Sequence, residues 1–147
     1  MSLTTDKFFY TALKANQQLV TLTKGRIFNT ARSSVDEKED RLPYIIITFD
    51  GLANNGETKD GVEGYTDTVQ IGVLCVTHER ESLAQLTVLC RQQLQAYYNL
   101  CQEDGTTDGA DDCPRDWAMS AEGVMYDDLK PCFYQALHYE CDTFKDE

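Results

Sequence analysis

The stretch from Gly64 to Cys101 constrains the fold most, because a long strand pattern runs directly into a long helix pattern. From Tyr65 to Thr77, apolar residues alternate with others, which indicates a strand with one buried face. From about Glu79 to Cys101, the apolar side chains fall within roughly 80° of the helix circumference, at about 100° per residue. We therefore expect the helix to lie on the sheet that contains the strand. The predicted core residues are Val69, Ile71, Val73, Cys75, Leu83, Leu86, Cys90, Leu94 and Tyr97.

The remaining patterns predict an α+β fold with a mostly antiparallel sheet of four or five strands. The sheet is expected to pack against the long helix and against a short N-terminal helix pair, in which Asn16 caps the second helix and Lys24-Gly25 ends it. Three consecutive isoleucines predict an interior strand from Tyr44 to Phe49. The other expected elements are a helix over Lys7–Ala15 and strands over Arg26–Asn29, Trp117–Tyr126 (with a bulge or bend at Gly123) and Cys132–Phe144.

The 147 residues are expected to form one domain spanning positions 1–147. Thirteen Lys and Arg face 25 Asp and Glu, for a net charge of −12. This charge repels phosphate backbones and anionic lipid, so a membrane binder or a specific nucleic-acid binder is not expected. No apolar run approaches the ~20 residues that span a bilayer, and no secretory signal is visible at the N-terminus.

The cysteines have no spacing typical of a zinc site, because no C-x-x-C occurs. Three of them fall on the predicted buried faces, where a free cysteine behaves as a small apolar residue. A chain without a signal sequence meets a reducing cytosol. We therefore expect all six to be thiols: Cys75, Cys90, Cys101, Cys113, Cys132 and Cys141.

An acidic stretch begins like a calcium-binding loop. Asp104, Thr106 and Asp108 stand at ligand positions 1, 3 and 5, and Gly109 stands at position 6. Position 12, which requires a bidentate Glu, is Arg115. A flexible acidic loop is the favoured interpretation, and an acidic calcium-binding module is kept as an alternative.

Catalytic patterns are not found. His78 and His138 are the two histidines, and no nucleophile elbow, phosphate-binding loop or metal-binding helix accompanies them. A Cys–His pair would need the fold to bring the two side chains together. The paired carboxylates Asp127-Asp128 are explained by a turn before Pro131. We predict that the protein is not an enzyme and has no catalytic, cofactor-binding or metal-ligating residues.

Several short strings follow one another in an order known from one family. They are Phe9 to Leu19, Gly25-Arg26-Ile27-Phe28, Leu42-Pro43-Tyr44-Ile45-Ile46-Ile47, Val69-Gln70-Ile71-Gly72-Val73, Glu81 to Leu86, and the closing hairpin from Met125-Tyr126-Asp127-Asp128 to Phe133 through Glu140. In this order the chain resembles the small tail-completion or tail-terminator proteins of long-tailed bacteriophages and prophages. The acidic insertion around Glu103 to Asp116 and the number of cysteines depart from the family pattern.

The resemblance implies a structural head–tail joining protein that assembles as a ring, typically a hexamer, at the head-proximal end of the tail tube. The implied partners are further copies of the chain, the tail tube protein and the head connector protein. DNA would pass through the lumen without specific binding, and the net negative charge would let it slide. The implied location is the host cytoplasm during assembly and then the head–tail junction of the virion. A head-side connector or stopper is the alternative from the same setting.

Ring formation requires two different patches that meet head to tail. We expect them among three places: the polar arm from Asn54 to Gly64, the exposed side of the helix from Glu79 to Cys101, and the edge strand of the sheet. The alternative for the helix residues is a wide apolar stripe that packs under neighbouring loops. The candidate interface residues are Asn54, Asn55, Lys59, Asp60, Val88, Leu89 and Tyr98.

Overall fold

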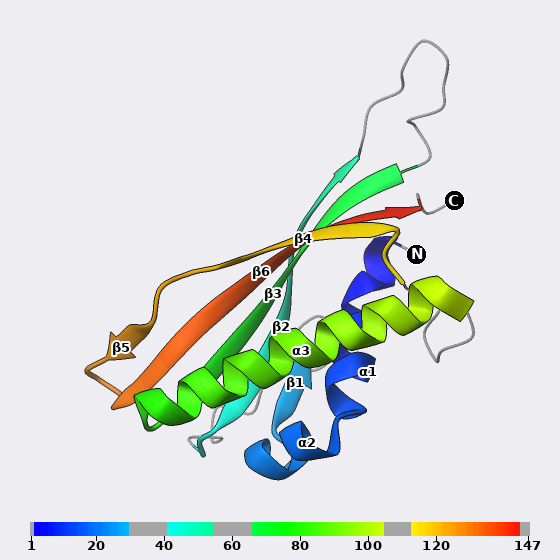
Figure 1. Cartoon of the computed structure of the whole chain (residues 1–147). Helices are drawn as coiled ribbons and strands as arrows, with labels where there is room; N and C mark the ends of the chain where they lie inside the picture. The colour runs from blue at the N-terminus through cyan, green and yellow to red at the C-terminus, as the bar shows by residue number, and fades with distance from the viewer. Residues whose placement is uncertain (1, 30–40, 55–65, 105–112, 145–147) are drawn as a thin grey trace.

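The described chain folds into a mixed six-stranded sheet with helices against one face, as seen in a computed structural model that describes residues 2–29, 41–54, 66–104 and 113–144 (Figure 1). The expected α+β class is confirmed. None of the helices in these ranges combines the length and apolar character needed to cross a membrane. The elements are η1 (Ser2–Thr4), α1 (Thr5–Lys14), α2 (Gln17–Thr23), β1 (Ile27–Asn29), β2 (Tyr44–Asn54), β3 (Thr66–Thr77), α3 (Arg80–Asp104), β4 (Asp116–Ala121), β5 (Met125–Asp127) and β6 (Cys132–Phe144).

The sheet has the strand order β1-β2-β3-β6-β4, and β5 also pairs with β6. The β1–β2 pair is parallel and the other pairs are antiparallel. The sheet has six strands because the stretch expected as one strand from Trp117 to Tyr126 forms both β4 and β5. From Ala121 to Met125 the chain advances four residues, while β6 opposite advances three, from 137 to 134. One extra residue is thus accommodated around Gly123, as a bulge requires.

Strand β2 is longer than its sequence pattern predicts. We expected it to end at Phe49, but it continues to Asn54 after a shift of register between Phe49 and Gly51. At this shift the Thr48 hydroxyl donates to Asp50 Oδ1 over 2.7 Å. The neighbouring strand has Gly72 here, where a Cβ would lie 2.5 Å from Thr48 Oγ1 and 2.6 Å from Asp50 Oδ2. The missing side chain at Gly72 therefore gives the shifted strand its room.

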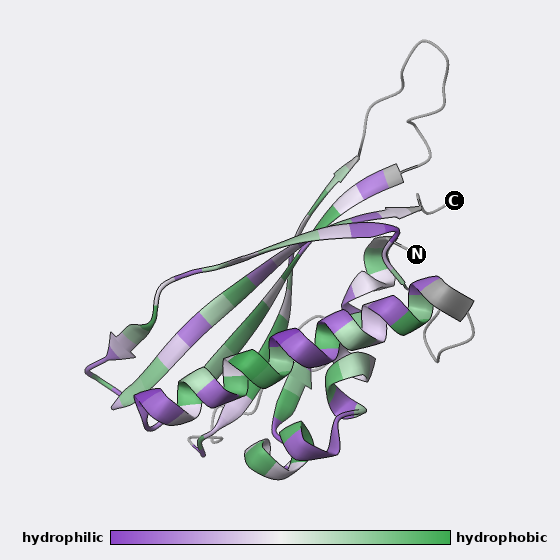
Figure 2. Ribbon diagram, in the orientation of Figure 1, coloured by the Kyte–Doolittle hydropathy of each residue, from purple (hydrophilic) through white to green (hydrophobic). Residues whose placement is uncertain are grey.

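The core lies between the sheet and α3, as the two sequence periods predict. Figure 2 shows polar and apolar segments alternating along α3, as expected of a helix with one buried face. Helix α1 contributes Phe8, Phe9 and Leu13 to the same core. Burying each large apolar side chain stabilises the fold by about 1.5–3 kcal/mol. All nine predicted core residues are 9 % exposed or less: Val69, Ile71, Val73, Cys75, Leu83, Leu86, Cys90, Leu94 and Tyr97.

The N-terminal helix pair is joined to α3 by polar side chains. The predicted cap of α2 is confirmed, because Asn16 Oδ1 accepts a hydrogen bond from the Leu19 amide at 2.9 Å. Asn16 Nδ2 in turn donates to Gln93 Oε1 of α3 at 3.0 Å, and Gln93 Nε2 donates to the Ala12 carbonyl at 2.8 Å. Gly25 follows α2 at φ +79°, in the left-handed region predicted for it.

Arg26 joins the start of β1 to the start of β2. Its Nε donates to the Pro43 carbonyl at 3.2 Å, and its Nη2 donates to the Leu42 carbonyl at 3.0 Å. The Arg26 carbonyl accepts from the Ile45 amide at 3.0 Å. Two of the strings that carry the family resemblance are therefore hydrogen-bonded to each other.

The expectation of six thiols is wrong for two of them. Cys101 and Cys113 form a disulfide, with their Cα atoms 6.5 Å apart. Cys101 lies near the end of α3 and Cys113 lies just before β4. The sequence around each cysteine does not indicate that the other lies close to it in the fold. The other four cysteines are free and buried, and the Sγ atoms of Cys75 and Cys90 lie 3.8 Å apart.

Candidate assembly surfaces

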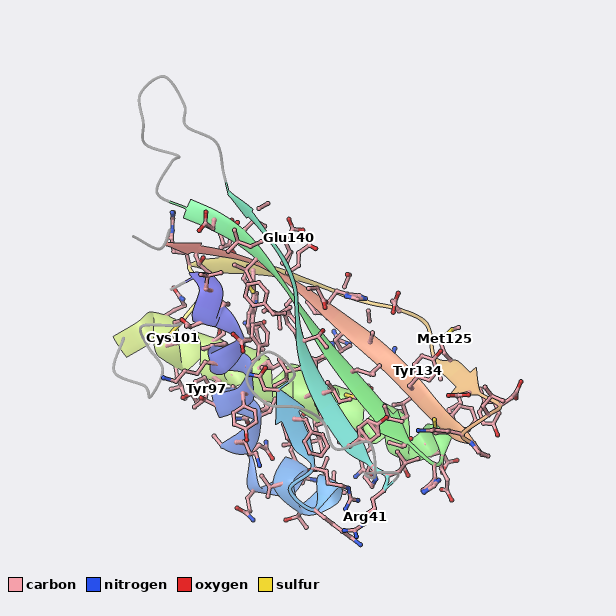
Figure 3. All side chains as sticks on the ribbon, turned by 180° about the vertical axis from the view of Figure 1, so that it is seen from behind. Arg41, Tyr97, Cys101, Met125, Tyr134 and Glu140 are labelled. Carbon is pink, nitrogen blue, oxygen red and sulfur yellow. A yellow bond between two sulfur atoms is a disulfide. The ribbon has the colours of Figure 1, made fainter. Side chains whose placement is uncertain are left out.

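The face of the sheet opposite the helices has an apolar end and an acidic end. Figure 3 shows this side, with Tyr134 near one end of β6 and Glu140 toward the other. The apolar end consists of the half-buried residues Phe28, Tyr44, Ile46, Leu74 and Tyr134. The acidic end consists of Asp50, Asp116, Glu140 and Asp142.

The acidic end concentrates negative charge at some cost to stability. Asp116 lies directly across from Asp142 in the β4–β6 register, and like charges in this position are destabilising. Hydrogen bonds hold both carboxylates in place. The Trp117 amide donates to Asp116 Oδ1 at 2.8 Å, and the Thr68 hydroxyl donates to Asp142 Oδ1 at 3.1 Å.

A second surface is the hairpin tip, which we define as residues 124–129. Its apolar side chains are exposed by 38 % at Val124, 52 % at Met125, 49 % at Tyr126 and 95 % at Leu129. Asp127 Oδ1 accepts hydrogen bonds from the amides of Leu129 at 2.9 Å and of residue 130 at 3.3 Å. Leu129 therefore sits in a closed turn while its side chain stays exposed. Sequence reasoning recognised the turn but not the tip, although apolar residues on both sides of an acidic pair were a visible signal.

The third surface is a groove between α3 and the edge strand β4, with a volume of about 580 Å³. Its apolar lining comes from Val88, Ala96, Met119 and Tyr139. Its polar lining comes from α3 and includes the cation of Arg91 and the amides of Gln92, Gln95 and Asn99. We call this the α3–β4 groove.

The candidate interface residues on α3 separate into two groups. Val88 is 47 % exposed and lines the α3–β4 groove. Leu89 and Tyr98 are half-buried and pack against the core, which is the alternative that the sequence left open. The Tyr98 hydroxyl donates to the Arg115 carbonyl at 3.0 Å, and burial, followed by the charge of Asp116, raises the pKa of Tyr98.

The candidates in the polar arm lie at the limit of the described chain. Asn54 is the last residue of β2 and pairs with Asp67 of β3. Asn55, Lys59 and Asp60 lie outside the described residues. Asn54 therefore belongs to one end of the sheet, and the structure does not bring it together with the α3 candidates.

Metal-binding chemistry has little support in the described part of the chain. No group of three or more His, Cys, Asp or Glu side chains that could hold a metal ion occurs there. Of the loop that begins like a calcium site, Asp104 is the last residue of α3 and positions 105–112 lie outside the described residues. His138 places its Nε2 atom 3.4 Å from Glu122 Oε2, on side chains that are 45 % and 63 % exposed.

One cysteine and one histidine do share a hollow. Cys132 and His78 line a space of about 310 Å³ beside the hairpin tip. Burial, followed by the charge of Asp127, raises the pKa of Cys132, although Lys130 opposes this shift. A nucleophilic cysteine needs the opposite shift, toward the thiolate. The pair therefore does not have the electrostatics of an activated nucleophile.

Comparison with known proteins adds no relative. No model of a known protein family matches the chain, and no curated protein matches it significantly. A functional interpretation therefore depends on the residues themselves. Their geometry offers three distinct contact surfaces: the acidic end of the open sheet face, the hairpin tip and the α3–β4 groove.

Proposed function

We propose that this protein is a non-enzymatic structural subunit that closes the tail tube of a bacteriophage or prophage and joins the tail to the head. The observation that carries the proposal is the order of family-like strings along nearly the whole chain, from Phe9 to Glu140. In its working state the protein is a ring, a hexamer by family likeness. It assembles in the host cytoplasm and remains at the head–tail junction of the virion.

The positions of the strings support this proposal. Gly25-Arg26-Ile27-Phe28 and Leu42-Pro43-Tyr44 meet through the Arg26 hydrogen bonds at the β1–β2 pair. Val69 to Val73 forms the middle of β3, and Glu81 to Leu86 lies in the first turns of α3. The strings thus form the sheet and the helix that packs on it. Their resemblance to the family therefore supports a common fold, and we take the common fold as support for a common role.

The separate contact surfaces also support a ring. Head-to-tail closure requires two unlike patches on each subunit. The hairpin tip protrudes and is mainly apolar, whereas the α3–β4 groove is hollow and carries a cation. In such a ring, the acidic end of the sheet would take no part in the contacts between subunits.

We assign the acidic end to the lumen, where it would repel DNA phosphates and let DNA slide. The triple substitution Asp116→Asn, Glu140→Gln and Asp142→Asn removes three negative charges from it. Particles that carry these changes should eject DNA more slowly or retain part of it. The matched control is Glu81→Gln on α3, which should leave ejection unchanged. Normal ejection by the triple variant would refute the lumen assignment.

The proposed function is tested by reconstitution with tail tubes of the same phage or prophage. The purified protein should bind one end of each tube, and electron microscopy should show a ring there. Absence of any end-bound density at saturating protein would contradict the proposal. Binding to the portal or head connector alone would favour the head-side stopper. Heat released on titration with calcium would favour the metal-binding alternative.

A further inference from the structure

We propose that the hairpin tip of one copy of this chain inserts into the α3–β4 groove of a second copy, and that this is the contact that closes the ring. The inference extends the proposed function by naming the two patches that meet. Neither patch was among the residues expected at the interface, apart from Val88.

The hairpin tip has the properties of an anchor. It carries four of the eight large apolar side chains that are exposed in the described part of the chain, within six consecutive residues. Leu129 is 95 % exposed, and its turn is held by hydrogen bonds from its own amide and from the next amide to Asp127 Oδ1. Because the turn is already ordered, binding would cost little conformational entropy. Clustered apolar exposure of this kind marks an interaction surface.

The α3–β4 groove has the complementary properties. Its floor is apolar, with Met119 and Tyr139 at the base and Val88 and Ala96 on the helix wall. Its volume of about 580 Å³ is ample for a leucine and a methionine side chain. It borders β4, an edge strand of the sheet, so another molecule can approach from the side.

Charge selects this groove over the other hollows. A chain with net charge −12 repels its own copies, so a contact that places a cation against an anion is favoured over one that brings carboxylates together. The tip carries Asp127 and Asp128, and the groove carries Arg91 and no carboxylate. The hollow at the start of α3 contains Glu79, and the hollow on the open sheet face contains Asp50 and Glu140. The remaining hollow carries Lys130 and no carboxylate, but Leu129 of the same chain's tip lines it, so this hollow adjoins the tip and is set aside on position and not on charge.

The tip cannot fill the groove of its own chain. Met125 is paired with Tyr134 of β6, whereas the groove floor lies at Tyr139. Five strand residues separate these positions, or about 17 Å along β6. A tip that fills this groove must therefore come from a second copy, and repetition of the same unlike contact produces a closed ring or an open filament.

The experiment uses the full chain, both free at high concentration and bound to tail tubes. Leu129→Cys in the tip and Gln92→Cys in the groove are joined with a short bismaleimide crosslinker. We expect a ladder of crosslinked multimers that ends at the closed ring. Each cysteine variant alone should give no ladder. Absence of the ladder in both preparations, or crosslinks to the tail tube protein in place of a second copy, would overturn the inference.

A charge exchange provides the second arm. Asp128→Arg and Arg91→Asp should each reduce multimer formation at least tenfold, and the double variant should restore most of it. Leu100→Asp, at an exposed position on α3 outside the groove, is the matched control and should have no effect. Circular dichroism should show that every variant is folded. Weakening by both single variants without recovery in the double variant would contradict direct pairing.

The two arms separate this inference from the proposed function. Tube capping without tip–groove crosslinks would retain the proposed function and overturn the contact. Crosslinked rings that do not bind tube ends would retain the contact and overturn the function.

Discussion

The indole ring of Trp117 on β4 stacks on the phenol ring of Tyr98 on α3, with ring centroids 4.3 Å apart and ring planes 19° apart. Phe8 and Phe9 of α1 surround the same indole, with centroids 5.9 and 5.8 Å away. This cluster fixes the edge strand of the sheet against the long helix. It therefore also sets the separation of the two walls of the α3–β4 groove.

Removing the Tyr98 ring should destabilise the protein. Tyr98→Ala is expected to lower the free energy of unfolding by about 2 kcal/mol, because a half-buried aromatic contact and its packing are lost. Trp117 is the single tryptophan, so its fluorescence reports the change directly. We expect emission to move to longer wavelength in Tyr98→Ala and to move little in Tyr98→Phe. Unchanged emission and stability in Tyr98→Ala would show that the stack does not hold β4.

Arg26 should stabilise the fold through its two hydrogen bonds to the carbonyls of Leu42 and Pro43. Arg26→Ala leaves these acceptors without the guanidinium, and we expect a loss of about 1.5 kcal/mol in urea unfolding. Arg26→Lys should recover part of it, since lysine lacks the planar fork. Arg80→Ala, at an exposed position, is the control. Equal stability of Arg26→Ala and the wild type would remove Arg26 from the scaffold.

The disulfide between Cys101 and Cys113 can be tested by counting free thiols. Thiol titration of the denatured, unreduced protein should find four thiols, and reduction should raise the number to six. The double substitution of both cysteines by serine should lower stability by about 2–3 kcal/mol, as expected for closing a loop of this length. Six thiols before reduction would contradict the structure at this point.

Alkaline pH should destabilise the fold. Hydrogen bonding to Cys75, followed by burial, raises the pKa of Cys90, and burial raises the pKa values of Tyr139 and Cys141. A group whose pKa is raised by folding stabilises the protein fully below its unfolded pKa, which is about 8.5 for cysteine and about 10 for tyrosine. That contribution is lost as pH rises toward the folded pKa.

The midpoint of thermal unfolding should therefore fall steadily as pH rises above about 8.5. Cys141→Ala should show a shallower fall, because one of the three groups no longer titrates. The measurement requires a reductant-free buffer and short exposure, so that thiol exchange does not contribute. A midpoint that stays level or rises over this range would contradict the assigned pKa directions.

The sequence predicted the part of the fold that depends on local periods. Alternation in β3 and the helical period in α3 identified the residues that form the core, since both elements bury one face. The cap at Asn16 and the helix end at Gly25 were also predictable, because their chemistry is local. The parallel pairing of β1 with β2 was not, because a three-residue strand carries no pattern that specifies its neighbour.

The candidate site was less predictable for a similar reason. The α3–β4 groove is formed by residues far apart in the chain, such as Val88 and Met119, and neither local pattern indicates that they meet. The disulfide depends on the return of the chain from α3 to β4. The turn sequence predicts a turn at Leu129. It does not predict whether the rest of the fold covers that turn, so the exposure of Leu129 could not be foreseen.

The most direct test of the central claim is the elongation of tail tubes in the presence of this protein. Preformed tubes are incubated with the protein, fresh tail tube protein is added, and tube lengths are measured by electron microscopy. We predict that one end of each tube stops growing and that a ring is present at this closed end. Continued growth at both ends, at saturating protein, would contradict the proposal that the chain closes the tail tube.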